Sequence, residues 1–211
     1  MRGLRIALTK GRLEKKTIAL LQRCGYDCTD LCQPGRRLIL PVRNAEIDVV
    51  LAKAPDVITY VEHGVVEMGV VGKDTILENG QSFFEVLDLG FGRCRFALAA
   101  REDEPFFDTY RRRRVATKYP NVARQYFSKR GLDVEIIRIE GSVELSPLLG
   151  LADGIVDIVE TGETLRANGL TPIADIAEVS ARLIVNVAAM KLHKKAIVHL
   201  IDTLQKHREG A

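Results

Sequence analysis

The chain has 211 residues, of which 46% are hydrophobic and 28% charged, a composition typical of a globular protein with one large or two small α/β lobes. Its 31 basic and 28 acidic residues give a net charge of +3, which is too balanced to indicate nucleic-acid binding but suits an anionic small molecule. No apolar run reaches roughly 18 residues and the N-terminus lacks the apolar region of a signal peptide, so we predict a cytosolic protein that does not contact a membrane.

Strand-like apolar runs alternate with amphipathic helical runs along the whole sequence. The predicted strands cover residues 4–9, 37–43, 47–53, 66–72, 84–90, 94–100, 114–120, 134–140, 155–159 and 182–190. The predicted helices cover residues 13–24, 55–64, 74–80, 121–130, 143–152, a short segment from 163, and 191–208. This alternation favours an α/β fold with mostly parallel sheets.

The cysteines and histidines indicate no metal centre. Cys24, Cys28 and Cys32 are spaced by four, unlike the CxxC and Cys/His patterns of zinc sites, and the histidines form no HExxH motif. We expect the cysteines to be small buried side chains with free thiols.

Two segments share the pattern acid-Thr-(Ile/Leu)-x-x-Asn-Gly, namely DTILENG at 74–80 and ETLRANG at 163–169. Each follows an apolar strand and opens a short helix. A chance match explains the likeness, but so does a duplicated strand-turn-helix with one copy in each of two lobes. The second explanation would place two helix N-termini on either side of a cleft that suits an anion.

The second of these segments begins at the end of DGIVDIVETGETL, residues 153–165. This stretch reads as a strand, a Thr-Gly turn and a helix start. Helix-start amides, hydroxyls and a glycine that permits close approach are the groups that bind phosphate oxygens, so Thr161, Gly162, Glu163 and Thr164 form a candidate phosphate cradle. An ordinary turn with a Thr cap explains the same residues, and Glu163 also fits a first-turn acid that interacts with the helix dipole.

Carboxylates close to this turn favour a phosphorylated sugar over a bare phosphate. Asp153, Asp157, Glu160 and, upstream, Glu140 can accept hydrogen bonds from ribose hydroxyls, or hold a Mg²⁺ that bridges a diphosphate. Taken singly, each is more often a surface or capping residue.

Two further sets of residues lie at strand ends and contain basic side chains. They are Lys10, Gly11 and Arg12 in LTKGRL, and Arg36, Arg37 and Lys53. The first set lacks the P-loop pattern. Convergent Arg and Lys side chains could neutralise a leaving diphosphate, whereas the alternative is that they are solvated charges.

The run Arg111–Arg114 is interpreted as a solvated rim or a surface that faces a partner, because no aromatic residues are interleaved with it as single-strand binding would require.

No Ser-His-Asp or Cys-His arrangement is evident. The absence of an obvious covalent nucleophile suits a direct reaction between two bound substrates, which the protein positions and stabilises electrostatically.

The ordered segments LTKGRL, GRRLILPV, VEHGVVEMGVVGKD, LDLGFGRCRFALA, RVATKYPN and ADGIVDIVETGETLRANGL resemble the ATP phosphoribosyltransferase family of histidine biosynthesis. The resemblance extends from about residue 4 to 190. It implies a two-lobed fold like that of type II periplasmic binding proteins, with a ligand cleft between the lobes. Lobe I would comprise residues 1–90 and 180–211, and lobe II residues 91–179.

The resemblance also implies a reaction in which N1 of the ATP adenine attacks C1 of 5-phosphoribosyl 1-pyrophosphate (PRPP) and displaces pyrophosphate, with Mg²⁺ present. The implied PRPP-binding residues lie in and near the Thr-Gly turn: Glu140, Asp153, Asp157, Glu160, Thr161, Gly162, Glu163 and Thr164. Within this set, Thr161, Gly162 and Thr164 would hold the 5′-phosphate, and Glu140 and Asp153 the ribose hydroxyls. The implied catalytic residues are Lys10, Arg36 and Lys53, and the implied ATP-binding residues are Gly11, Arg12 and Tyr119.

One position departs from the family. Lys53 stands in KAPDVI where relatives usually carry an arginine, and Ile58 stands where they carry a proline. Lysine keeps the charge but loses the bidentate fork of arginine. We therefore expect PRPP binding to survive and stabilisation of the leaving group to depend more on Arg36.

The length resembles the short form of the family, which implies a regulatory subunit similar to histidyl-tRNA synthetase and a homodimer of this chain within a hetero-octamer. The main alternative is a small-anion ligand-binding module of the same fold. A different phosphoribosyltransferase is a second alternative, but the common class has two adjacent acids before its Thr-Gly loop, whereas Asp157 and Glu160 are separated here.

Overall fold

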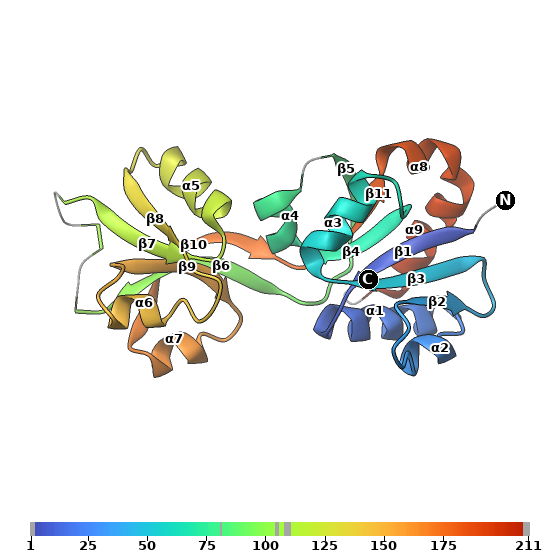
Figure 1. Cartoon of the computed structure of the whole chain (residues 1–211), viewed down its shortest axis with the longest axis horizontal. Helices are drawn as coiled ribbons and strands as arrows, with labels where there is room; N and C mark the ends of the chain where they lie inside the picture. The colour runs from blue at the N-terminus through green and yellow to red at the C-terminus, as the bar shows by residue number, and fades with distance from the viewer. Residues whose placement is uncertain (1–2, 81, 104–105, 108–110, 209–211) are drawn as a thin grey trace. The chain divides into compact units, whose positions relative to one another are not determined.

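The structure is a computed structural model that describes residues 3–80, 82–103, 106–107 and 111–208 (Figure 1). Its contacts divide the chain into two compact units. Unit 1 comprises Met1–Gly92 and Ser180–Ala211, and unit 2 comprises Arg93–Val179. These divisions lie close to the lobe boundaries expected from the sequence at 90 and 179. Each unit has its own sheet and core.

Unit 1 is built on a six-stranded sheet in the order β2-β3-β1-β4-β11-β5. The strands are β1 Leu4–Thr9, β2 Ile39–Val42, β3 Ile47–Ala52, β4 Met68–Gly72, β5 Phe83–Asp88 and β11 Ala181–Asn186. The helices are α1 Arg12–Arg23, α2 Thr29–Cys32, α3 Ala54–Glu62, α4 Lys73–Asn79, α8 Val187–Leu192 and α9 Lys194–His207. Strands β3, β1 and β4 are parallel, whereas β2, β11 and β5 run antiparallel to their neighbours.

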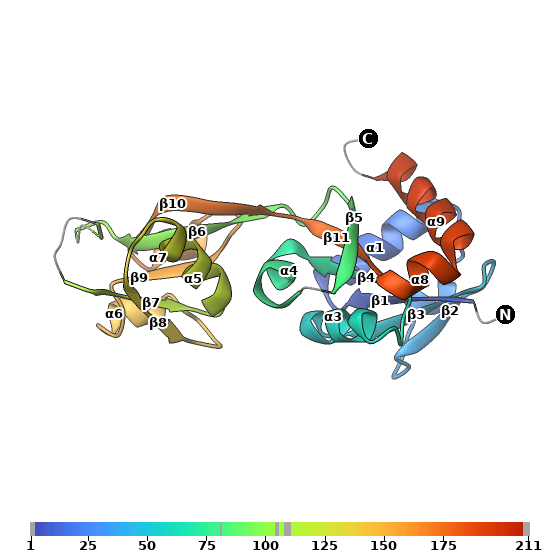
Figure 2. The ribbon, with the colours of Figure 1, turned by 90° about the horizontal axis from the view of Figure 1, so that it is seen from above.

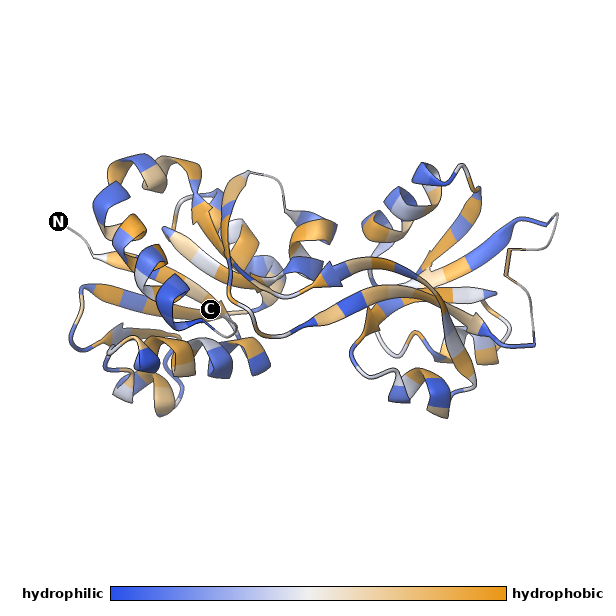
Figure 3. Cartoon of the chain, turned by 180° about the vertical axis from the view of Figure 1, so that it is seen from behind, coloured by the Kyte–Doolittle hydropathy of each residue, from blue (hydrophilic) through white to orange (hydrophobic). Residues whose placement is uncertain are grey.

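Helices cover both faces of this sheet. On one face, apolar residues of α1 and α9 such as Leu20 and Ile197 share a core with Leu8 of β1. On the other, Val57 of α3 lies in a second core with Ala7. Burying a large aliphatic side chain contributes about 1.5–3 kcal/mol, so these helices are held by their apolar faces. Figure 3 shows the resulting mixture of hydrophobic and hydrophilic residues along the helices.

Unit 2 is built on a five-stranded sheet in the order β10-β6-β9-β7-β8. The strands are β6 Cys94–Arg101, β7 Arg113–Thr117, β8 Val134–Arg138, β9 Gly154–Val159 and β10 Leu170–Val179. Helix α5 (Pro120–Lys129) covers one face, and the short helices α6 (Leu145–Leu148) and α7 (Glu163–Ala167) lie on the other (Figures 1 and 2). None of the described helices is long and apolar enough to cross a membrane.

The expectation of mostly parallel sheets was wrong, because both sheets are mixed. Strand β6 is antiparallel to β9 and β10, and β11 is antiparallel to β4 and β5. The chain leaves unit 1 after β5, enters unit 2 at β6, and returns from β10 into β11. Antiparallel neighbours do not need the crossover helix that joins parallel strands. The alternation of strands and helices alone could therefore not reveal the direction of these strands.

Several predicted elements differ from those observed. The sequence analysis missed β10, which contains Pro172 and has register shifts against β6. The predicted strand 182–190 ends at Asn186, whose side chain caps α8 by accepting a hydrogen bond from the Ala189 amide at 2.9 Å. Of the predicted helix 143–152 only α6 forms. All four cysteines are free, but only Cys28 is buried as expected, since Cys24 and Cys94 are partly exposed and Cys32 is exposed.

Candidate active site

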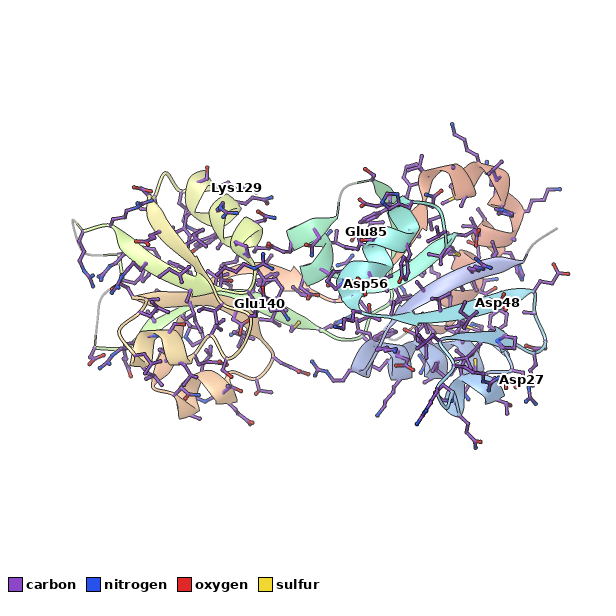
Figure 4. All side chains as sticks on the ribbon, viewed as in Figure 1. Asp27, Asp48, Asp56, Glu85, Lys129 and Glu140 are labelled. Carbon is purple, nitrogen blue, oxygen red and sulfur yellow. The ribbon has the colours of Figure 1, made fainter. Side chains whose placement is uncertain are left out.

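The parallel strands of unit 2 bring three loops to one edge of the sheet. Strands β7, β8 and β9 are parallel, so the segments that follow their carboxyl ends meet there. Lys118 and Tyr119 follow β7, Glu140 follows β8 (labelled in Figure 4), and residues 160–164 follow β9. The predicted PRPP-binding residues other than Asp153 and Asp157 therefore lie in loops at this edge.

The Thr-Gly turn has the backbone geometry of a phosphate-binding turn. Gly162 has φ 75°, a left-handed conformation that favours glycine, and it caps α7. The Thr161 hydroxyl accepts a hydrogen bond from the Glu163 amide at 3.3 Å, which forms a Thr turn, whereas the N-cap position that the sequence analysis gave to a Thr is occupied by Gly162. Leu165 is buried and anchors the helix, while Thr161 and Thr164 are exposed. The Thr161 hydrogen bond and a phosphate cradle are compatible, because the first amides of a helix have no intrahelical partner.

Two carboxylates beside the turn differ in environment. Glu140 is exposed and forms an ion pair with Arg138 at 2.7 Å, in which both side chains are 68% exposed. Such surface pairs contribute little to stability, so Glu140 can exchange this partner for another. Asp157 is instead partly buried. Burial is the largest cause of a shift that raises the pKa of its carboxyl to about 6. The nearby charge of Glu144 raises this pKa further, whereas Lys118 lowers it.

Tyr119 is held between the sheet and α5. Its ring packs edge-on against Phe96 with ring centroids 4.8 Å apart, and its amide donates to the Thr117 hydroxyl at 2.9 Å. It caps α5 and lies at the same edge as the Thr-Gly turn. Its contact with a nucleotide stays a prediction.

The structure argues against Asp153 as a ribose ligand. This residue precedes β9, at the opposite end of the strand from the Thr-Gly turn. Its side chain is 4% exposed. Oδ1 accepts a hydrogen bond from Arg111 Nη2 at 2.6 Å, and Oδ2 accepts one from the Arg114 amide at 2.7 Å. Both carboxylate oxygens are thus used inside unit 2.

The interpretation of Arg111–Arg114 as a solvated rim was wrong for Arg113, which is buried, whereas the other three side chains stay at least partly exposed. Arg111, Arg113 and Arg114 all lie within 4 Å of Asp153, at 2.6, 3.7 and 3.9 Å. The Arg113 side chain is only 10% exposed and also donates to the Phe106 carbonyl at 2.9 Å. An acidic residue 39 or more positions away pairs with three arginines of the run, and local sequence patterns cannot reveal such a partner.

In unit 1 the predicted basic residues also gather at one edge of the sheet. Strands β1 and β3 are parallel, and the Lys10 amide donates to the Ala52 carbonyl at 2.9 Å, so Lys10 and Lys53 follow neighbouring strand ends. Strand β2 is antiparallel to β3, which brings the loop that precedes it, with Arg36, to the same edge. Gly11 has φ 103° and opens α1. Lys10, Gly11, Arg12, Arg36 and Lys53 are all exposed.

Basic residues at this edge fall into two groups. Arg37 is tied to Asp30 at 3.1 Å and Lys73 to Glu85 at 2.5 Å. In contrast, Lys10, Arg36 and Lys53 form no ion pair with any residue that the structure describes. A group of cations without acidic partners is the arrangement expected where an anion binds.

The two seven-residue repeats form similar helices, α4 and α7. In each, the Asn side chain donates to the Thr carbonyl four residues earlier, at 3.2 Å for Asn79 and 2.8 Å for Asn168. They differ in exposure, since Thr75 is buried and Thr164 is exposed. Only the threonine of the unit 2 copy is therefore accessible from the surface of its unit. Whether the two helix starts face one cleft stays a prediction.

Comparison with known proteins identifies the family. The family described as HisG, ATP phosphoribosyltransferase, matches residues 53–206. The ATP phosphoribosyltransferase of Clostridium kluyveri is 58% identical over 204 residues, which cover 97% of this chain and 93% of the relative. The chain belongs to the ATP phosphoribosyltransferase family. The enzyme of the same name from Clostridium acetobutylicum is 54% identical over 98% of this chain and 96% of its own length.

Solved structures agree on the fold. A chain of the "ATP phosphoribosyl transferase (HisG:HisZ) complex" from Thermotoga maritima matches with a TM-score of 0.83 and 31% identity, over 96% of this chain and 97% of that one. The periplasmic aliphatic sulphonate binding protein SsuA from Escherichia coli matches with a TM-score of 0.63 at 13% identity, over 98% and 72%. The latter shows the fold alone, and it confirms the expected likeness to periplasmic binding proteins.

Members of the ATP phosphoribosyltransferase family catalyse the first step of histidine biosynthesis, as the sequence resemblance predicted. Among the residues that the structure describes, no group of three or more His, Cys, Asp or Glu side chains is placed to hold a metal ion.

Proposed function

We propose that this chain transfers the phosphoribosyl group of PRPP to N1 of the ATP adenine, with the sugar and its 5′-phosphate bound at the Thr-Gly turn of unit 2. The observation that carries this assignment is the Thr161-Gly162 turn, in which Thr161 is exposed and which lies with Glu140 at the carboxyl edge of one sheet. A phosphorylated sugar offers an anion to helix-start amides and hydroxyl donors to carboxylates. One ligand thus explains both kinds of residue.

The basic edge of unit 1 is proposed to stabilise the leaving group. The N1 lone pair forms a bond to C1 of the ribose, the C1–O bond breaks, and its electron pair leaves with pyrophosphate. Negative charge develops on the departing oxygen, and Lys10, Arg36 and Lys53 are the cations proposed to meet it. Preorganised charge of this kind acts most strongly in the transition state. Gly11 and Arg12 are assigned to the phosphates of ATP, and Tyr119 to its nucleoside.

We further propose that Mg²⁺ enters the reaction with the substrates, bound to phosphate oxygens of ATP and PRPP. Mg²⁺ commonly keeps several waters and is held by substrate phosphates with few protein ligands. The absence of an acidic metal cluster among the described residues is compatible with this mode of binding.

A HisZ-type subunit is the proposed protein partner. The support is that the Thermotoga maritima relative was solved as a HisG:HisZ complex and matches nearly all of this chain. A homodimer of this chain within a hetero-octamer is the assembly that the sequence resemblance implies. The alternative function, a small-anion binding module, shares the fold of SsuA but does not account for 58% identity to an ATP phosphoribosyltransferase.

The Thr-Gly assignment predicts a loss of PRPP binding in Thr161→Ala. Removing the hydroxyl takes one donor from the 5′-phosphate, and we expect kcat/KM for PRPP to fall by about 10- to 100-fold, because hydrogen bonds to charged groups contribute about 1.5–3 kcal/mol. Steady-state kinetics with varied PRPP measures this change. The matched control is Thr171→Ala, an exposed threonine on β10, which we expect to leave the constant within twofold. Equal effects of the two substitutions would contradict the assignment.

Lys53→Arg is predicted to raise kcat. Arginine at this strand end would restore the bidentate fork toward a phosphate that lysine cannot provide, and the expected gain is about 2- to 10-fold. The same substitution at Lys191, in the last turn of α8, serves as the control. A kcat for Lys53→Arg that is unchanged or reduced would show that Lys53 does not act on the leaving group.

A further inference from the structure

A lysine that the sequence analysis did not assign lies near the partly buried carboxylate of Asp157, which is assigned to the PRPP site. Strands β7 and β9 are parallel, with Thr117 opposite Val156. β7 ends at Thr117 and Lys118 is the next residue, while Asp157 is the residue of β9 that follows Val156. The charge of Lys118 lowers the pKa of Asp157, by less than burial or Glu144 raises it. The register of the sheet therefore sets a cation against this carboxylate.

Asp157 occupies an unusual position for an acid. Its side chain lies in line with Ile155 and Val159, since alternate residues of a strand point to the same face, and these two neighbours belong to the apolar core of unit 2. On the other side, β6 places the small residue Ala97 opposite Asp157. A carboxylate in an apolar row costs stability when ionised, so the position calls for a functional explanation.

The charged groups that face Asp157 are opposite in sign. Lys118 on β7 favours the ionised carboxylate, and Glu144, in the loop before α6, disfavours it. The residue of β6 beside it is an alanine, and α7 contributes the buried Leu165 to the same core. The ionisation of Asp157 is thus set by burial, by a hydrogen bond from the Ile158 backbone amide, which lowers the pKa, and by these two side chains.

We propose that Lys118 is a positioning residue of the PRPP site, whose ammonium keeps the Asp157 carboxylate ionised to accept hydrogen bonds from the ribose hydroxyls, in opposition to Glu144. The inference rests on the proposed function, because it requires the sugar to bind at this edge. Lys118 acts through Asp157, and its loss should matter mainly at pH values where Asp157 titrates.

The sign of the pH dependence follows from the pKa of about 6. Below this value Asp157 is protonated and accepts fewer hydrogen bonds, so kcat/KM for PRPP falls as the pH decreases. This fall is the acidic limb of the pH profile. Lys118→Met removes a charge that lowers the pKa of Asp157, so the acidic limb moves to higher pH. Glu144→Gln removes a charge that raises the pKa, which moves the limb to lower pH. Lys118→Arg keeps the charge and should restore the wild-type limb.

The experiment measures kcat/KM for PRPP from pH 5 to 9 in the full chain and these variants. For Lys118→Met we expect a value about two- to threefold below wild type at pH 5.5, which corresponds to a shift of about half a pH unit, and no change at pH 8.5. Substrate phosphates also titrate in this range, but equally for every variant. Lys129→Met, an exposed lysine at the end of α5 (Figure 4), is the control.

Three outcomes would be informative in different ways. Opposite shifts of the limb in Lys118→Met and Glu144→Gln, with rescue by Lys118→Arg, support the inference. If Asp157→Asn removes the limb but neither neighbour moves it, Lys118 is not a positioning residue, although the site assignment stands. If Asp157→Asn has a wild-type profile and a wild-type KM for PRPP, the assignment of the PRPP site itself is wrong, and the inference falls with it.

Discussion

Asp153→Asn is expected to lower the free energy of unfolding by about 3–5 kcal/mol, because it leaves the arginines around position 153 without their buried counter-charge. The carboxylate is 4% exposed and has three guanidinium groups within 4 Å, of which that of Arg113 is itself buried. Urea unfolding followed by circular dichroism measures the loss. Because Asp153 lies at the far end of β9 from the Thr-Gly turn, the folded variant should keep the wild-type KM for PRPP.

A matched control is available in the same arginine run. Asp133 pairs with Arg112 at 3.1 Å, but the two side chains are 79% and 59% exposed, so Asp133→Asn should change the stability by less than about 0.5 kcal/mol. If Asp153→Asn were as stable as the wild type and raised the KM for PRPP, the ribose contact predicted from the sequence would be correct and the structural role wrong.

Arg36→Ala is expected to lower kcat by about 10²- to 10³-fold with a much smaller change in KM for PRPP, because its charge is proposed to act on the pyrophosphate as it leaves. Single-turnover kinetics by rapid quench measures this chemical step directly. Because Lys53 stands where the sequence resemblance implies an arginine, we expect the chain to depend strongly on Arg36.

The neighbouring arginine provides the control. Arg37 is tied to Asp30, which also binds Arg43 at 2.7 Å, so Arg37 contributes to the loop rather than to the ligand. Arg37→Ala should keep kcat within about threefold of the wild type. Equal losses in Arg36→Ala and Arg37→Ala would show that the loop conformation, and not the Arg36 charge, carries the effect.

Sequence reasoning located the strand–helix junctions that carry the candidate site because those junctions are local features. The Thr-Gly turn, the Lys-Gly-Arg loop and the strand-end lysine Lys53 each depend on a strand that ends where a helix begins, and apolar periodicity detects such junctions. The comparisons then confirmed the family and the fold that these segments indicated.

Features that depend on distant partners were not predictable in the same way. Asp153 looked like a ligand because it stands near the Thr-Gly turn in the sequence, yet the length of β9 separates them in space. Lys118 acquires its role only from the register of β7 against β9, and β10 is a strand because β6 lies beside it. Pairing of strands is a tertiary property, so a single sequence leaves it open.

The most direct test of the account is formation of phosphoribosyl-ATP by the purified chain from ATP, PRPP and Mg²⁺, followed by absorbance and repeated with a HisZ-type subunit. We predict product that accumulates in proportion to enzyme and an equal release of pyrophosphate. No product in either assay, together with no PRPP binding by calorimetry, would contradict the account and leave a ligand-binding module as the better description.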